Sequence, residues 1–169
     1  MNWGNMAEIC PTVTAYDLHE YRAQIERIEP FAERIHIDLM DGEFAPTLSP
    51  PIDTIWLPEN ITSDIHLMYK HPTEFIEPLL QLRPHMVIIH YEALVDHAHF
   101  ASELHSAGVK VGLALLQDTE VEQAAEILHI FDQVLIFSGN LGHHGGEADV
   151  ALLEKVKQVS VQIAEAAAE

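Results

Sequence analysis

The sequence predicts an α/β fold with one parallel sheet, and three observations support this class. Short apolar runs rich in β-branched residues recur roughly every 22 to 30 residues. Longer stretches with apolar residues three and four positions apart lie between these runs, as expected for amphipathic helices. Runs such as 111–116 are apolar on both faces, which is typical of strands in a parallel sheet covered by helices. We therefore expect one domain of 169 residues, built as a barrel or as an open doubly wound sheet.

The alternation of strand and helix repeats six times along the chain. The runs expected to form strands are 8–13, 34–40, 63–68, 86–90, 109–115 and 133–137. The first three predicted helices carry apolar residues at helical spacing: Leu18, Tyr21, Ile25 and Ile28, then Phe75, Leu79 and Leu82, then Phe100, Leu104 and Ala107. Residues that end helices, Pro30, Pro84 and Gly108, stand where these segments should stop.

A last helix is predicted from about Asp149 to the end of the sequence. Its apolar residues recur at helical spacing and should form one buried face, made of Val150, Leu153, Val156, Val159 and Ile163. The sequence shows no low-complexity linker, so we expect no domain boundary before this helix.

Composition excludes several classes of protein. The chain has 8 Lys+Arg against 27 Asp+Glu, a formal charge of −19, and it carries no basic stripe. A surface this acidic repels phosphate backbones and anionic lipid, so we expect no nucleic-acid partner and no membrane partner. With 48% hydrophobic residues the chain is too apolar for an acidic disordered protein. Its apolar runs are too short to span a bilayer and no signal-peptide pattern opens the chain, so we expect a cytoplasmic protein.

The chemistry available to the chain lies in its histidines rather than in its cysteines. Cys10 is the only cysteine, which rules out an intrachain disulfide, and we expect it to be a small buried strand residue. The twelve histidines supply most of the groups that can bind a metal or transfer a proton near neutral pH.

Two neighbouring strands place such groups on one face. The two-residue period puts His36, Asp38 and Met40 on the same side of the second strand. It also groups Asp64, His66 and Met68 on the third strand. Two imidazoles and a carboxylate that converge from adjacent strands suit a divalent transition metal, with zinc favoured when a coordination position stays open. The alternative is that each histidine is a hydrogen-bonded core residue.

Two further polar segments follow strands. His90 and Glu92 stand at the end of the fourth strand. A glycine-rich segment, 138–147, follows the sixth strand and precedes a helix, so its amides could surround a phosphate or could simply form a flexible turn. His143 and His144 in this segment could hold a metal, but adjacent loop residues more often face solvent, which is what we expect here.

These motifs resemble those of a known family, the ribulose-phosphate 3-epimerases. Residues 36–48 read HIDLMDGEFAPTL and are similar to the family signature His-x-Asp-x-Met-Asp-Gly-x-Phe-x-Pro-Asn-Leu. Residues 64–68, DIHLM, resemble a second signature, Asp-x-His-Leu-Met. The two motifs occur in the family's order and at its separation, and the resemblance extends from CPT at 10–12 to the helix after the glycine turn.

The resemblance implies an eight-unit βα (TIM) barrel. It also implies an isomerase of the pentose phosphate pathway that interconverts D-ribulose 5-phosphate and D-xylulose 5-phosphate by moving the proton on C3 through an enediolate. The implied cofactor is a divalent metal such as zinc, iron or manganese, and two aspartates act as acid and base. By resemblance His36, Asp38 and His66 are metal ligands, and Asp38 is also one acid/base.

The resemblance also implies substrate contacts. Thr12 stands where the family has a serine. Met40 and Met68 resemble the methionines that shield the enediolate, and Gly142, Gly145 and Gly146 resemble half of the phosphate cradle.

Several residues depart from the family pattern. Phe137 replaces a third methionine, Leu116 and Gln117 replace Asn-Pro, and Leu141 replaces a proline of the glycine turn, which is one residue longer around 143–144. These loops should govern substrate preference, so a sibling activity on another phosphosugar, such as allulose 6-phosphate, stays open.

The length leaves a further alternative open. The sequence accounts for six of eight βα units, and the family's second aspartate and fourth metal ligand would lie on a seventh strand. We therefore expect a barrel domain truncated at its C-terminal end, with impaired activity, or a non-catalytic remnant or fragment that binds metal or phosphosugar. The open edges of the first and sixth strands predict a homo-oligomer, or a rearranged closure in which the last helix covers an edge.

Overall fold

The computed structural model describes residues 9–145, 147 and 149–166. Its six strands form one sheet in which each strand pairs in parallel with the next strand of the chain. The strands are β1 (Thr12–Thr14), β2 (Arg34–Met40), β3 (Thr62–Met68), β4 (Met86–His90), β5 (Lys110–Leu115) and β6 (Gln133–Ile136). A doubly wound sheet reverses its strand order at a switch point, whereas this order never reverses, as in a barrel wall. The structure thus confirms an α/β, TIM-barrel-like fold with six units.

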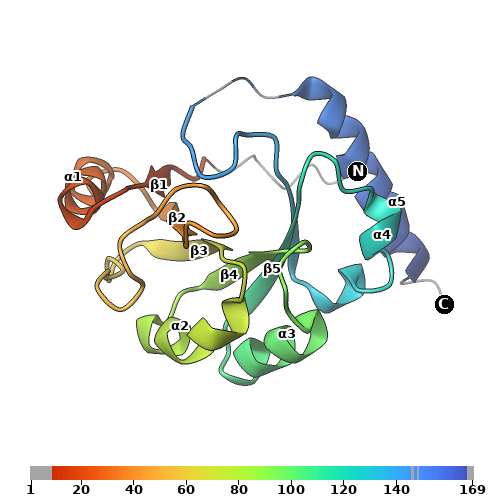
Figure 1. Ribbon diagram of the computed structural model, residues 1–169, viewed down its shortest axis with the longest axis horizontal. Coiled ribbons are helices and arrows are strands. Elements are labelled where there is room, and N and C mark those ends of the chain that lie inside the picture. The colour runs from red at the N-terminus through yellow and green to blue at the C-terminus, as the bar shows by residue number, and fades with distance from the viewer. Residues whose placement is uncertain (1–8, 146, 148, 167–169) are drawn as a thin grey trace.

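The helices lie along the outside of the curved sheet (Figure 1). They are α1 (Leu18–Ile28), α2 (Ile76–Leu82), α3 (His97–Ser106), α4 (Val121–Ala124) and α5 (Leu153–Ala166), with 3₁₀ turns at Pro72–Phe75, Leu128–Ile130 and Val150–Leu152. Local sequence sets where they begin. The Asp17 carboxylate accepts from the Glu20 amide at the start of α1, and Asp96 accepts from the His99 amide at the start of α3. None of the helices among the described residues has the length and apolar character needed to cross a membrane.

The two faces of the sheet have different roles. Ile35, Ile37 and Leu39 of β2 are at most 1% exposed and pack under the helices in the main core. The residues between them, His36, Asp38 and Met40, point to the concave face, as the two-residue period predicts. The helix-covered face therefore supplies the main core, and the concave face carries His36 and Asp38 together with Met40.

The first strand is shorter than predicted. It begins at Thr12, whereas the apolar run predicted a start at residue 8, which itself lies outside the described residues. Pro11 has no amide hydrogen and cannot donate to a ladder, although its carbonyl accepts from the His36 amide at 2.9 Å. Regular pairing therefore starts one residue later.

The last helix is turned differently from the prediction. Of the expected apolar face only Val159 is buried, while Val150, Leu153, Val156 and Ile163 are exposed. The buried side of α5 contains Lys155 instead, whose ammonium group donates to the carbonyls of Leu116, Gln117 and Thr119 after β5. These three hydrogen bonds hold the Lys155 side of α5 against the loop after β5. The buried face predicted from apolar spacing alone was therefore wrong, apart from Val159.

Candidate functional site

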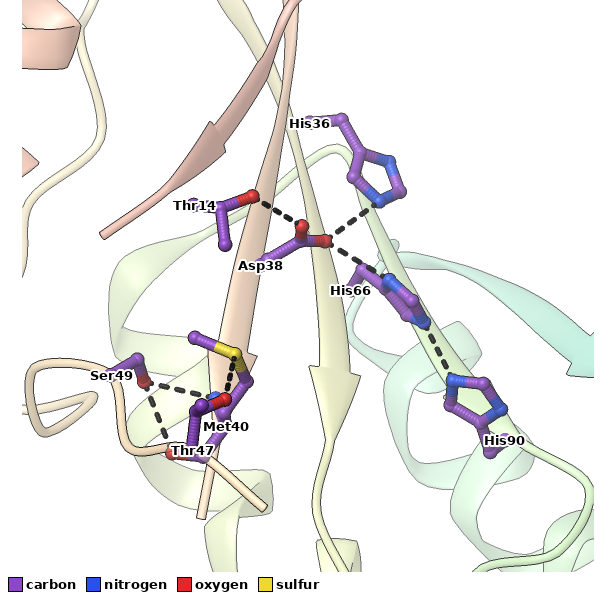
Figure 2. A network of polar contacts seen from close by, with 8 residues as sticks. All are labelled: Thr14, His36, Asp38, Met40, Thr47, Ser49, His66 and His90. Carbon is purple, nitrogen blue, oxygen red and sulfur yellow. Dashed lines mark hydrogen bonds and ion pairs between the residues drawn. The ribbon is translucent and has the colours of Figure 1, made fainter. Parts of the chain in front are cut away.

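His36, Asp38 and His66 come together on the concave face of the sheet (Figure 2). The β2–β3 ladder places Asp38 directly opposite His66, and His36 lies two residues before Asp38 on β2. The Asp38 Oδ1 atom lies 3.0 Å from His66 Nδ1 and 3.3 Å from His36 Nε2. One nitrogen from each imidazole and one carboxylate oxygen all lie within 4.8 Å of one another, close enough to share one cation.

The charge states of these groups suit metal binding. Burial alone would raise the pKa of Asp38, but hydrogen bonds with His36 and His66 and their attraction lower it well below its usual range. Burial lowers the pKa of His66 to about 4 against the opposing effect of Asp38, so this imidazole is neutral at pH 7. Ionised carboxylates and neutral imidazoles are the forms that bind metals. Two nitrogen donors and one oxygen donor therefore fit a divalent transition metal with open positions.

Thr14 holds the other oxygen of the carboxylate, a role that the sequence analysis missed. Its hydroxyl donates to Asp38 Oδ2 at 2.7 Å, and the residue is 4% exposed. The β1–β2 ladder sets Thr14 opposite Asp38. The two-residue period places Thr14 on the same face as Thr12, and this signal could have identified it.

His90 is a second residue whose role was missed. It is fully buried at the end of β4, and its Nε2 atom lies 2.8 Å from Nε2 of His66 (Figure 2). The sequence placed polar groups at 90–92 without indicating any partner for them. With Thr14 on β1, the site therefore extends across four strands, β1 to β4.

Apolar side chains cover the carboxyl-end side of this cluster. Met40 and Met68 are each 1% exposed and pack together with Ala45, Phe44 and Leu141. The Phe137 ring lies 5.9 Å from the His66 ring. Apolar side chains therefore lie next to His66 on this side of the cluster.

Two cavities meet at Asp38. One of about 240 Å³ lies among Thr12, His36, Asp38, His66 and residues 135–139. The other, of about 520 Å³, lies between β1, α1 and the loop after β6, and both Thr14 and Asp38 line it. Thr12 is exposed on β1 and lines both cavities. Asp38 is therefore accessible from both spaces.

The glycine-rich segment closes over the same edge of the sheet. Gly142 and Gly145 have φ values of 77° and 84°, a region that favours glycine. The carbonyl of Gly142 accepts hydrogen bonds from Thr47 at 2.6 Å and Tyr16 at 3.4 Å. Gly145 lines the larger cavity, whereas Gly146 lies outside the described residues.

Comparison with known proteins adds independent information. The family model described as "Ribulose-phosphate 3 epimerase family" matches residues 8–169. The ribulose-phosphate 3-epimerase of Treponema pallidum (strain Nichols) is 34% identical over 129 residues, which cover 74% of this chain and 59% of that protein. That of Mycobacterium tuberculosis (strain ATCC 25618 / H37Rv) is 29% identical over 154 residues, 89% of this chain and 67% of that protein. That of Bacillus subtilis (strain 168) is 30% identical over 159 residues, 91% of this chain and 73% of that protein. The matched part thus spans about three fifths to three quarters of the relatives' length.

Proposed function

Because the chain belongs to the ribulose-phosphate 3-epimerase family, we propose that it acts on D-ribulose 5-phosphate and moves the proton on C3 to give D-xylulose 5-phosphate. The observation that carries the proposal is the convergence of His36, Asp38 and His66 within 4.8 Å beside a cavity that Asp38 lines. The family match supports the substrate class, and the geometry supports the chemistry.

Asp38 is the proposed base. Its lowered pKa keeps it ionised at pH 7, and the hydroxyl of Thr14 holds one of its oxygens. The carboxylate would take the proton from C3, and the electrons of the C–H bond would move toward the neighbouring carbonyl to form an enediolate. Return of a proton to the opposite face of C3 completes the inversion.

The same cluster is the proposed metal site. His36, Asp38 and His66 would hold a divalent cation such as zinc, iron or manganese. When bound, such an ion supplies stabilisation of negative charge on the substrate oxygens. The apolar wall of Met40, Met68 and Phe137 would exclude water from the enediolate, and the loop after β6, with Gly142 and Gly145, would face the phosphate.

Inversion needs a second acid/base on the face of C3 opposite Asp38. Within the described residues the His/Asp cluster contains a single carboxylate, that of Asp38. We therefore expect this chain to exchange the C3 proton on one face faster than it converts the substrate to its epimer. A missing acid/base group commonly lowers a rate by about 10²- to 10⁴-fold, and only the conversion needs the second group.

Exchange in D₂O tests the proposal. Purified protein loaded with Zn²⁺, Fe²⁺ or Mn²⁺ should bind the metal and catalyse uptake of deuterium at C3 of D-ribulose 5-phosphate. Asp38→Asn should reduce the exchange rate by at least about 100-fold, whereas the exposed control Asp53→Asn should not change it. Metal binding without exchange would contradict the enzymatic proposal and favour a non-catalytic protein that binds metal or phosphosugar.

A sibling substrate is the second candidate. Leu116 and Gln117, together with the loop 139–146, depart from the family pattern, and the Gln117 side chain donates to the Gly139 carbonyl at 3.1 Å. The two segments that differ from the family pattern therefore contact each other through this hydrogen bond. Faster exchange with allulose 6-phosphate than with ribulose 5-phosphate would decide for this candidate.

We also propose that the chain is a cytoplasmic protein, as expected for an enzyme with a phosphorylated substrate, and that it self-associates. Within the described residues β1 and β6 each pair with one neighbour only, and Leu153, Val156, Val161 and Ile163 of α5 are between 43% and 61% exposed. Light scattering should give a mass above that of one chain, and Val156→Glu should lower it while Lys157→Glu does not. A monomeric wild-type protein would contradict this.

A further inference from the structure

We propose that His90 and Glu92 are positioning residues that select the tautomer of His66 and so strengthen metal binding at the site. The proposal rests on the metal role proposed above for His66. It concerns two side chains that contact neither the substrate cavity around Asp38 nor the cation itself.

The geometry makes His66 a link between two partners. Its Nδ1 atom lies 3.0 Å from Asp38 Oδ1, and its Nε2 atom lies 2.8 Å from Nε2 of His90 (Figure 2). His66 is 1% exposed and His90 is 0% exposed, so water does not supply alternative partners. Two imidazole nitrogens at this distance share one proton, and one ring must donate while the other accepts.

Metal binding decides which ring donates. Nδ1 is the His66 nitrogen on the side of Asp38, 3.0 Å from its Oδ1 atom, whereas Nε2 points to His90. If His66 binds the cation together with Asp38, Nδ1 must therefore keep its lone pair. The proton of neutral His66 then lies on Nε2 and is donated to Nε2 of His90. As a consequence, the proton of neutral His90 lies on its Nδ1 atom.

That proton faces a carboxylate. His90 Nδ1 lies 3.4 Å from Glu92 Oε2, and the structure gives neither of these buried atoms a hydrogen-bond partner within the part of the chain that it describes. The Glu92 charge favours a proton on His90 Nδ1 and disfavours a lone pair there. It therefore favours, through His90, the tautomer in which His66 Nδ1 is free to bind a metal.

Glu92 is itself held in place. Its Oε1 atom accepts hydrogen bonds from the Leu116 amide at 3.0 Å and from the Thr119 hydroxyl. The Thr119 carbonyl accepts from Lys155 of α5 at 2.6 Å. The His90 ring is flanked by Phe44 at 4.8 Å and Phe137 at 5.8 Å. The orientation of His66 is thus tied to elements as distant as α5.

Metal affinity, measured by competition with a chromophoric chelator and without substrate, tests the proposal. Glu92→Gln should weaken Zn²⁺ binding about 10-fold, and His90→Phe, which removes the acceptor, should weaken it up to about 100-fold. His90→Gln keeps an acceptor oxygen and should lose less than His90→Phe. The exposed controls Glu103→Gln and His99→Gln should bind Zn²⁺ as the wild type does.

Two spectroscopic readouts separate positioning from other roles. Long-range ¹H–¹⁵N NMR of the Zn²⁺-bound wild type should show the His66 proton on Nε2 and the His90 proton on Nδ1. In the metal-free protein, where no cation fixes the tautomer, these two assignments should be less populated in Glu92→Gln than in the wild type. The Co²⁺ absorption spectrum should be the same in wild type and His90→Gln. Loss of a nitrogen ligand in that variant would make His90 a ligand and overturn the proposal.

The affinity data also separate this inference from the proposed function. Zn²⁺ binding by the wild type with no change in Glu92→Gln and His90→Phe would overturn the positioning role and leave the metal site standing. A wild-type protein that binds no divalent metal would refute the metal site and the positioning role together. Urea unfolding of each variant in the metal-free state shows that the fold is retained.

Discussion

The Nζ atom of Lys155 on α5 lies 2.6 Å from the carbonyl oxygen of Thr119 in the loop after β5. The same ammonium group also donates to the carbonyls of Leu116 and Gln117, and the residue is 8% exposed. A buried charge is satisfied here by three backbone acceptors rather than by an acid. Because this loop also binds Glu92, α5 stabilises the loop that supports the candidate site.

Replacement of Lys155 should therefore cost stability. Lys155→Met leaves three loop carbonyls without their donor, and we expect the free energy of unfolding to fall by about 3 kcal/mol. Lys157→Met on the same helix removes a 73% exposed side chain and should change it by less than about 0.5 kcal/mol. Urea denaturation measures both, and equal losses would contradict the role assigned to Lys155.

The Thr47–Gly142 contact predicts the effect of a single methyl group. A Cβ on Gly142 would overlap Thr47 Oγ1 and lie 3.2 Å from the Cβ of Ala45, at a φ of 77°. Gly145 has a similar φ of 84° but nothing within 4 Å. Gly142→Ala should thus destabilise by about 1 to 2 kcal/mol more than Gly145→Ala and speed amide exchange in the loop. Indistinguishable unfolding curves would show that the contact is not formed in solution.

Thr14 should tune metal affinity through Asp38. Thr14→Val removes the 2.7 Å hydrogen bond to Asp38 Oδ2, so the carboxylate is less firmly oriented, and Zn²⁺ affinity should fall about 10-fold. Thr14→Ser keeps the hydroxyl and should bind nearly as tightly as the wild type. Thr62→Val, at an exposed position of β3, is the control. Chelator competition measures all three, and equal affinity of Thr14→Val and Thr14→Ser would refute the role.

Gly112 on β5 is required by close packing inside the sheet. A Cβ there would lie 2.8 Å from Ile88 Cγ1 and 3.4 Å from Met86 Sδ. Gly112→Ala should therefore lower the free energy of unfolding by about 1 to 3 kcal/mol. Gly139→Ala meets only the Phe137 ring at 3.4 Å and serves as control. If Ile88→Ala makes room, the double variant should lose less than the sum of the single losses.

Glu92 should add a pH dependence to stability. Burial alone raises the pKa of Glu92, but the nearby His90 ring and the hydrogen bonds from Thr119 and the Leu116 amide outweigh this effect and lower the pKa from 4.5 to about 2. A carboxyl group whose pKa is lowered by folding stabilises the protein above its unfolded pKa and loses this contribution as pH falls through the folded value. The difference in unfolding free energy between wild type and Glu92→Gln should thus shrink by about 1 to 2 kcal/mol between pH 5 and pH 2. With Glu103→Gln, the difference should stay constant in the same metal-free buffers.

Much of the fold was predictable because it depends on local periodicity. The bounds of β2 and β4 coincide with the predicted runs 34–40 and 86–90. The alternation of His36 and Asp38 with Ile35 and Ile37 follows from the pleat of a strand. The strand order was open between a barrel and a doubly wound sheet, because neighbouring positions in a sequence do not specify which strand edges meet.

The residues of the candidate metal site were also predictable as a group. His36 and Asp38 lie on one face of β2 by the two-residue period, and His66 lies on β3, the next strand along the chain, where it pairs with Asp38. Their roles as ligands and acid/base remain predictions that the proposed experiments test.

The six βα units, the faces of the strands and the family to which the chain belongs could all be predicted from the amino-acid sequence. The surroundings of the site became visible only in the folded protein: the hydroxyl of Thr14 on Asp38, the contacts from His66 through His90 to Glu92, and the buried face of α5 that contains Lys155. The physical reason is that strand and helix patterns come from contacts between near neighbours in the chain. Hydrogen-bond partners 24 to 39 residues apart depend on ladder register and helix rotation, which exist only once the sheet has formed.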